Sequence, residues 1–371
     1  MSIFNDSKIS NMRFIKIPNI DVAWDKVAIK VLSPSAFSWI CNGCAYQVLL
    51  QKVLYTLGDK SYSLPSHRNT ILGTIIHKIY ELTSKGVLST PKEMIEKWDQ
   101  LVDEQKRKQI ESYPTLLNPQ INDYDKRNKA IIYATTYLSN RSNLLSEPAN
   151  VRVFSEKSLV CEYIGLSGIV DKMIVDQDNI DIIDYKSGRV VDEGGNVKLE
   201  YIIQLHLYAA MCVHLSLGKI RSLKLIDIEG HIFDIVYDDG LSNNLVKDVA
   251  KKIDKLNNAV NTRQFGELIK PNKDRCSNCS CRHICNYMIQ SDDVPYRTIC
   301  GNVKSVSGQN MYILQDGNIT YYISGIDAYA IEDHSVYIGK KLVFLNVVSM
   351  STLLNNNTYR VTENTLVYEL W

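Results

Sequence analysis

Apolar residues fall into short runs in the middle of the chain, and the clearest pair of runs lies between Gly168 and Gly188. The runs at 169–175 and 180–185 flank a polar tip at 176–179. Two such runs joined by a short polar segment predict a β-hairpin.

Charged residues interrupt both runs of this hairpin. Because side chains alternate along a strand, we expect Asp184 and Lys186 on one face, with Ile183 and Tyr185 on the other. The hairpin also brings Asp171 of the first run beside Asp184. Neighbouring carboxylates repel each other unless a cation lies between them. We therefore expect Asp171 and Asp184 to hold a divalent metal ion, with Lys186 next to it.

Helical periodicity precedes the hairpin. The sequence LSPSAFSWICNGCAYQVLLQKVL predicts a helix that starts at Ser33, with a serine cap and a proline in the first turn. This helix would carry Cys41 and Cys44. A second helix, ILGTIIHKIYELTSKG, places Gly73 and His77 four residues apart and so on one face. A histidine on such a face is either a core residue or a metal ligand, and the motifs that follow favour the ligand.

Two more elements flank the hairpin directly. The segment VRVFSEKSLV predicts a strand that carries Glu156, and YIIQLHLYAAMCVHL predicts a helix with Gln204 and Tyr208 on one face. Basic residues between 90 and 145 form highly charged helical runs, which are more typical of solvated helix faces than of a nucleic-acid channel.

Four of the nine cysteines, Cys276, Cys279, Cys281 and Cys285, fall within ten residues. The N-terminus lacks the features of a secretory signal, so we expect a cytoplasmic protein with reduced thiols. Such density predicts metal ligation. Two metal centres fit at this stage: a local four-cysteine zinc knuckle, or a cluster that recruits a distant cysteine.

The composition is that of an ordinary globular protein. The chain has 371 residues with 45% apolar and 22% charged residues, and its net charge is +1. This length predicts two or three domains, and this charge gives no bulk attraction to nucleic acid. The most apolar long segment, 201–218, contains glutamine and histidine, so we expect no membrane partner. We expect an N-terminal segment at 1–32, a main domain at 33–290 and a small domain at 296–371, with the boundary at Asp293–Pro295.

The last segment predicts about five closely spaced strands, at 297–306, 310–314, 320–323, 341–348 and 358–368. A polar insert at 327–333 interrupts them. This pattern favours a small all-β barrel, of which the OB-fold is one form. In an OB-fold, Tyr312, Tyr321 and Tyr322 would be candidates to stack on the bases of a single strand, although strand tyrosines more often pack against a core.

Six motifs occur in the order found in RecB-like PD-(D/E)XK nucleases that contain an iron–sulfur cluster. They are a helix cysteine, Gly-x-x-x-His, Gly-x-x-Asp, Asp-Tyr-Lys, Gln-x-x-x-Tyr and Cys-x2-Cys-x5-Cys. The resemblance covers about residues 33–290. It implies an α/β fold, a restriction-endonuclease-like core in which helices flank a mixed sheet. It also implies a 4Fe-4S cluster held by Cys276, Cys279, Cys285 and either Cys44 or Cys41, of which Cys44 matches the motif better. Cys281 is not part of that pattern.

The same resemblance implies metal-assisted hydrolysis of phosphodiester bonds in DNA. His77, Asp171, Asp184 and the Tyr185 carbonyl would hold Mg²⁺ or Mn²⁺, which polarises the phosphate and lowers the pKa of a bound water. Lys186 would orient the water or stabilise the developing charge. The supporting residues in the family pattern are Gln204 and Tyr208.

The expected activity is a deoxyribonuclease, an exonuclease acting on single-stranded DNA or DNA ends, in DNA repair, CRISPR adaptation or phage defence. No Walker motif is present, so unwinding would come from a helicase or defence partner. Two alternatives remain open. One is a non-catalytic iron–sulfur subunit that binds nucleic acid or scaffolds a complex, and the other is a zinc-dependent DNA-binding protein.

Overall fold

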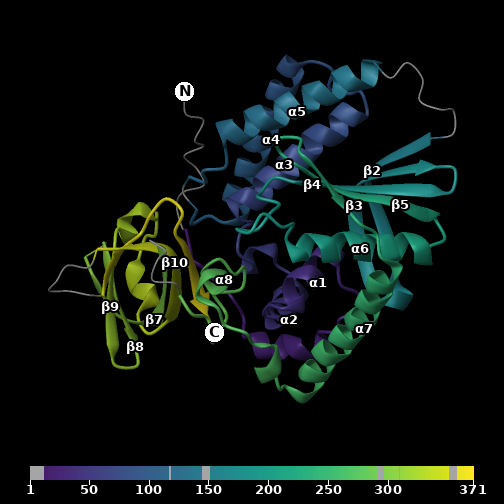
Figure 1. Ribbon diagram of the computed structural model, residues 1–371. Helices are drawn as coiled ribbons and strands as arrows, with labels where there is room; N and C mark the ends of the chain where they lie inside the picture. Colours follow the sequence, from purple (N-terminus) through teal and green to yellow (C-terminus); the bar gives the residue numbers. More distant parts are fainter. Residues whose placement is uncertain (1–11, 117, 144–150, 291–295, 309, 351–356) are drawn as a thin grey trace.

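The computed structural model describes residues 12–116, 118–143, 151–290, 296–308, 310–350 and 357–371 (Figure 1). The expected boundary at Asp293–Pro295 lies outside these residues. Two β-sheets organise the described chain, one in the middle of the sequence and one built mostly from its C-terminal part.

The first sheet is mixed and has the strand order β2-β3-β4-β5-β6. Its β4–β5 pair is parallel and the other pairs are antiparallel. A helix, α6, forms the crossover between the parallel strands, as parallel neighbours require. The strands are β2 (Val151–Cys161), β3 (Leu166–Asp176), β4 (Asn179–Lys186), β5 (Lys219–Asp227) and β6 (Ile232–Ile235).

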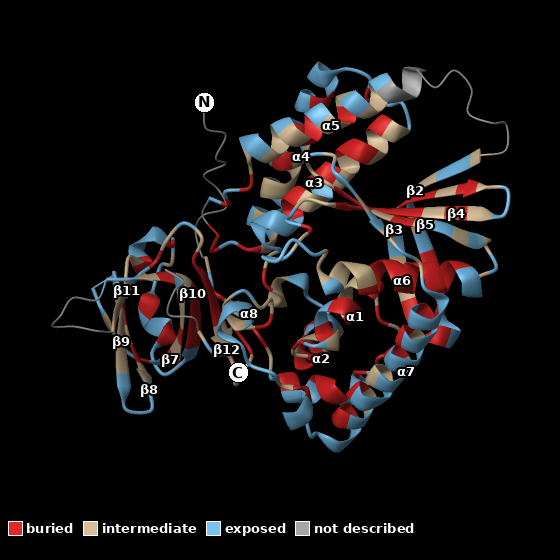
Figure 2. Ribbon diagram, in the orientation of Figure 1, coloured by how far each residue is buried: buried red, intermediate tan, exposed pale blue. Residues whose placement is uncertain are grey.

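Helices cover both faces of this sheet (Figures 1 and 2). One core cluster joins the strands to α1, α2, α6 and α7. A second core cluster packs α3, α4 and α5 on Ile183, Tyr185 and Ile226. The helices are α1 (Pro34–Cys41), α2 (Tyr46–Thr56), α3 (Arg68–Ser84), α4 (Pro91–Ser112), α5 (Tyr124–Asn143), α6 (Leu199–His214), α7 (Asp239–Thr262) and α8 (Lys273–Ser277). Short 3-10 helices occupy Ile20–Lys26, Lys60–Tyr62, Glu162–Ile164, Gly266–Leu268, Ile326–Ala328 and His334–Tyr337.

The predicted hairpin is present as β3 and β4, and its polar tip is where the prediction put it, from Asp176 to Asn179. The faces also agree with the prediction. Ile183 and Tyr185 contact the α3–α5 cluster, whereas Asp184 and Lys186 contact Gln204 of α6 on the other face. The mixed α/β architecture inferred from the sequence is therefore confirmed.

The helix predicted from Ser33 is two helices rather than one. Its start is as expected, since the Ser33 hydroxyl accepts a hydrogen bond from the Ala36 amide. The helix ends at Cys41, however, and Cys44 lies in the link before α2. At Gly43 a Cβ atom would come within 2.5 Å of the Trp39 carbonyl oxygen, so the link packs too tightly for a side chain there.

The C-terminal strands close on themselves. The strand order is β1-β12-β10-β11-β9-β8-β7, and β10 also pairs with β7, which makes the sheet barrel-like. An N-terminal strand, β1 (Ile15–Lys16), pairs with β12 at the other end of the chain. The remaining strands are β7 (Tyr296–Ser307), β8 (Met311–Asp316), β9 (Ile319–Ser324), β10 (Lys341–Ser349), β11 (Thr358–Arg360) and β12 (Leu366–Leu370).

Two expectations for this sheet are corrected. The single strand predicted at 358–368 is two strands, β11 and β12, because the turn closed by the hydrogen bond from the Thr365 amide to the Thr362 carbonyl separates them. Tyr312 is fully buried and its hydroxyl lies 2.8 Å from His334 Nδ1. It packs in the core of the sheet and is not available to stack on a base.

No helix in the described part of the chain combines the length and the apolar character needed to cross a membrane.

Candidate active site

Strand register places three carboxylates side by side. Glu156 of β2 lies opposite Asp171 of β3, between the pairs Ser155–Lys172 and Lys157–Val170. Glu156 has a φ of 53°, and no ladder pair forms between it and Asp171. The β3–β4 register, continued by one residue beyond its last pair, sets Asp171 opposite Asp184. Residues directly opposite on antiparallel strands share a face, so Glu156 and Asp171 lie together and Asp184 lies on the neighbouring strand beside them.

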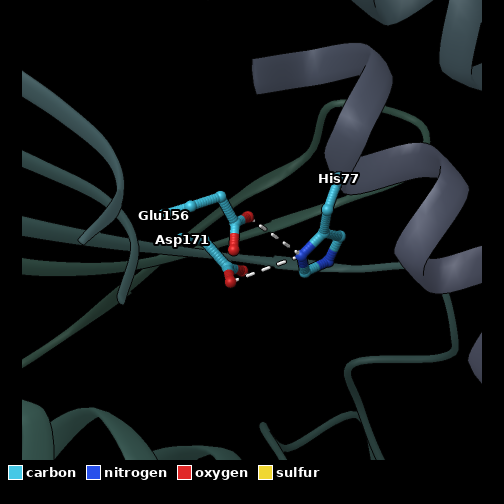
Figure 3. Close-up of side chains that lie close together, drawn as sticks. All are labelled: His77, Glu156 and Asp171. Carbon is cyan, nitrogen blue, oxygen red and sulfur yellow. Dashed lines mark ion pairs between the residues drawn. The ribbon is translucent and has the colours of Figure 1, made fainter. Parts of the chain in front are cut away.

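His77 of α3 lies beside Glu156 and Asp171 (Figure 3). Its Nδ1 atom lies 3.3 Å from Asp171 Oδ1 and 3.8 Å from Glu156 Oε1. Its Nε2 atom lies 3.1 Å from the Tyr185 carbonyl oxygen. The Tyr185 amide donates to Asp171 Oδ2 at 2.7 Å, which holds that carboxylate in place. The ligand atoms of His77, Glu156 and Asp171 lie within 4.8 Å of one another, a spacing that suits one metal ion.

Asp184 and Lys186 form a second, adjacent network with α6. Lys186 Nζ lies 2.8 Å from Asp184 Oδ2 and 2.9 Å from Gln204 Oε1. The Gln204 amide in turn donates to Asp184 Oδ1 at 3.0 Å. The Lys186 ammonium also lies over the ring of Tyr201, 4.4 Å from its centroid. One glutamine thus orients both charged groups of the β4 strand.

Tyr208 positions the backbone of β3 and forms no hydrogen bond with Asp171 or Asp184. Its hydroxyl donates to the Ile169 carbonyl at 2.7 Å. A Cβ atom at Gly168 would come within 2.9 Å of Pro34 and 3.1 Å of the Tyr208 ring. The glycine of Gly-x-x-Asp is therefore required for the close packing of α1 and α6 against β3, which sets the position of Asp171.

The electrostatics of this site favour a cation. Burial, followed by the nearby charge of Asp171, raises the pKa of Asp184 to about 6, although the Lys186 ammonium opposes the shift. Burial and Asp171 likewise raise the pKa of Glu156. Burial lowers the pKa of His77, but Asp171, Asp184 and Glu156 together outweigh it and raise that pKa to about 9. Carboxylates that repel one another recover their charge when a metal ion lies between them.

The structure brings His77 together with Asp171 and the Tyr185 carbonyl, and it brings Asp184, Lys186 and Gln204 together in the adjacent network. It adds Glu156, which sequence reasoning left outside the ligand set. The sequence signal for this residue was its place before the hairpin. Its contact with His77 depends on the β2–β3 register, which the local pattern does not specify.

The predicted cluster cysteines are less tightly grouped than His77, Glu156 and Asp171 among the described residues. The charges of Cys279, Cys44 and Cys276 add, after burial, to the raised pKa of Cys285, which is about 11. Burial lowers the pKa of Lys252 in α7, and the charge of Cys41 opposes that shift. Cys281 is buried, and its amide lies 3.5 Å from Cys279 Sγ. Of the two N-terminal cysteines, Cys44 is thus the one whose charge contributes to the raised pKa of Cys285.

Comparisons with known proteins relate this chain to nucleases. A family model described as "PD-(D/E)XK nuclease superfamily" matches residues 31–286. A crystal structure named "Putative exonuclease" from Eubacterium rectale is similar at 12% identity and TM-score 0.37, covering 79% of this chain and 96% of that one. The crystal structure of SSO0001 is similar at 14% identity and TM-score 0.26, covering 67% and 100%. No curated protein matches the sequence.

Proposed function

This chain belongs to the PD-(D/E)XK nuclease superfamily, and on that premise we propose that it is a deoxyribonuclease dependent on Mg²⁺ or Mn²⁺, acting as an exonuclease on single-stranded DNA or DNA ends. The observation that carries the proposal is the group of His77, Glu156 and Asp171, with ligand atoms within 4.8 Å of one another, next to the ion pair of Asp184 with Lys186. Charged groups are not buried together at low cost unless their charge is used.

The side chains present fit a divalent metal ion. Asp184 is 4% exposed, and its Oδ2 atom accepts no hydrogen bond from the described residues, so its one polar contact is the ion pair with Lys186. The ligands would be His77, Asp171, Asp184 and the Tyr185 carbonyl, with Glu156 added. Oxygen ligands of this kind suit Mg²⁺ and Mn²⁺. A bound ion would supply charge stabilisation at the scissile phosphate.

The chain's own residues have separate tasks in this proposal. Lys186, held by Asp184 and Gln204, directs its ammonium at the phosphate and at the attacking water. Gln204 keeps Lys186 and Asp184 in a fixed geometry, which lowers the reorganisation needed during reaction. Tyr208 keeps the Asp171 strand close to α6.

We further propose a 4Fe-4S cluster held by Cys44, Cys276, Cys279 and Cys285. The support is that Cys44, Cys276 and Cys279 all contribute to the raised pKa of Cys285, although Cys44 lies more than 200 residues away from Cys285 in the sequence. A zinc knuckle built only from the local cysteines would not include Cys44 as a ligand. Such a cluster would tie α1 and α2 to the segment after α7. It would also place the chain in the RecB-like branch, in which we propose a helicase or defence partner. As a separate proposal, the C-terminal barrel-like sheet is an OB-fold.

The test is cleavage of end-labelled single- and double-stranded DNA by anaerobically purified protein with Mn²⁺. We expect cutting by the wild type, loss of cutting in Asp184→Ala and in Asp184→Asn, and cutting at the wild-type rate by Asp178→Asn. Asp178 lies at the exposed tip of the same hairpin and serves as the matched control. A folded wild-type protein that cuts neither substrate would favour the non-catalytic subunit instead.

A further inference from the structure

A cavity of about 990 Å³ lies away from the carboxylates, between α2, the start of α3, the segment after α8 and the C-terminal sheet. Figure 1 shows α8 between that sheet and helices α1 and α2. The volume is at the upper end for ligand cavities, which span roughly 300–1,000 Å³. The nuclease proposal gives this cavity no role.

The lining of the cavity has one sign of charge. Among the described residues that line it there is no aspartate or glutamate, whereas Arg68 and Arg282 are present. Arg68 is paired with Asp123 at 3.3 Å, so Arg282 is the lining cation without an acidic partner among the described residues. The rest of the polar lining consists mainly of amides and hydroxyls. A polar cavity that contains cations and lacks carboxylates attracts anions.

Arg282 is held in the wall of this cavity by neutral partners. Its guanidinium donates to the Cys279 carbonyl at 3.2 Å and to Asn346 Oδ1 at 2.9 Å. Asn346 has a φ of 63° and lies where the register of β10 against β7 shifts between Leu345 and Val347. A β-bulge changes the direction in which a side chain points. A residue other than glycine with a positive φ is strained, and such residues are common at binding sites. The C-terminal sheet therefore holds Arg282 in place without neutralising its charge.

Two exposed tyrosines also line the cavity, Tyr55 of α2 and Tyr296 of β7. These residues are 78% and 48% exposed. The Lys52 ammonium lies over the Tyr55 ring, 5.2 Å from its centroid, so Tyr296 is the ring that is available to stack on a flat ligand. Cationic groups combined with accessible aromatic rings are the features that bind single-stranded nucleic acid without sequence preference.

The cavity and the carboxylate site lie on the same helix. Arg68 begins α3 and His77 lies nine residues further on, which corresponds to a rise of about 13 Å. A stacked strand rises about 3.4 Å per nucleotide, so about four nucleotides span this separation.

We propose that this cavity is a second binding site for single-stranded DNA, which holds the strand about four nucleotides from the bond that is cut. Arg282 contacts a phosphate, and Tyr296 stacks on a base. The inference rests on the proposed nuclease function for its substrate class. Its consequence is a length requirement, because only a strand that reaches both sites gains both sets of contacts.

The experiment measures binding in EDTA, so that it does not depend on cleavage. The probes are fluorescein-labelled oligothymidylates of four and twelve nucleotides, followed by fluorescence anisotropy. We expect the wild type to bind the longer strand at least tenfold more tightly. Arg282→Gln and Tyr296→Ala should each weaken binding of the longer strand about tenfold.

Two matched glutamine-to-glutamate variants distinguish an effect on the cavity from an effect of misfolding. Gln120 is exposed and lines the cavity, whereas Gln100 is exposed on α4 and does not line it. Gln120→Glu should weaken binding of the longer strand and Gln100→Glu should not. Equal wild-type affinity for both lengths, or equal effects of the two glutamate variants, would overturn the second site.

The Mn²⁺-dependent cleavage of the four-nucleotide probe, measured in parallel, separates this result from the nuclease proposal. We expect the variants Arg282→Gln and Gln120→Glu to retain that cleavage. Length-dependent binding by a protein that cuts nothing would leave the cavity assignment standing and refute the nuclease.

Discussion

Lys186 has an ammonium group shared between Asp184 and Gln204. Removing it should leave the metal ligands in place but take away the positive charge beside the reacting phosphate. We expect Lys186→Ala to lower the cleavage rate about 10²- to 10³-fold and to change DNA affinity in EDTA less than threefold. Single-turnover cleavage and anisotropy measure the two quantities. Cleavage by Lys186→Ala at the wild-type rate would remove Lys186 from the proposed chemistry.

Metal binding should release a proton from His77. At pH 7.5 the free site has Asp184 ionised, since its pKa is about 6, and His77 protonated, since its pKa is about 9. A metal ion needs the neutral imidazole, so Mn²⁺ binding should release about one proton per ion at pH 7.5. Binding should weaken as the pH falls below 9, and more steeply below 6, where Asp184 also takes up a proton. Calorimetry in buffers with different ionisation enthalpies counts these protons.

The control for this measurement is a second histidine. His214→Ala, at the exposed end of α6, should release the same number of protons as the wild type, whereas His77→Ala should release fewer. Unchanged release from His77→Ala would mean that the proton comes from another group.

At the scale of elements, the link between α1 and α2 separates the two N-terminal cysteines. Cys44 lies in this link, and its charge adds to the effect of burial in raising the pKa of Cys285. Cys41 is the last residue of α1, and its charge opposes the burial that lowers the pKa of Lys252. We therefore expect Cys44→Ser to lose the brown colour and most of the iron of anaerobically purified protein, and Cys41→Ser to keep both. Iron and acid-labile sulfide analyses make the comparison. A brown Cys44→Ser protein would exclude Cys44 as a required ligand.

At the scale of the whole molecule, the two ends of the chain meet in one sheet, where β1 pairs with β12. Just before β1, Phe14 is 4% exposed and packs against Tyr312, Tyr329, Tyr337 and Phe344. Phe14→Ala should destabilise the C-terminal sheet by about 3–5 kcal/mol. Hydrogen exchange of the β7–β10 amides measures this loss.

The control for this prediction lies a few residues further along the chain. Val22 is 65% exposed, and Val22→Ala should change the protection of those amides little. Full protection in Phe14→Ala would mean that the N-terminal segment adds nothing to the stability of the C-terminal sheet.

Local pattern was sufficient for much of the fold and the site. The two runs around Asp176–Asn179 specified a hairpin, and strand alternation put Asp184 and Lys186 on one face. Helical spacing put Gln204 and Tyr208 on one side of α6. These features depend on the strand period of two residues and the helix period of about 3.6 residues. Both periods can be recognised within a short stretch of sequence.

The sequence by itself therefore determined which chemical groups the chain carries and which of them share an element. Only the tertiary structure decided which elements meet: Glu156 beside His77, Cys44 beside Cys285, and Arg282 against Asn346. The physical reason is that strand register and helix packing depend on side chains that are distant in sequence, so a local pattern leaves these contacts unspecified.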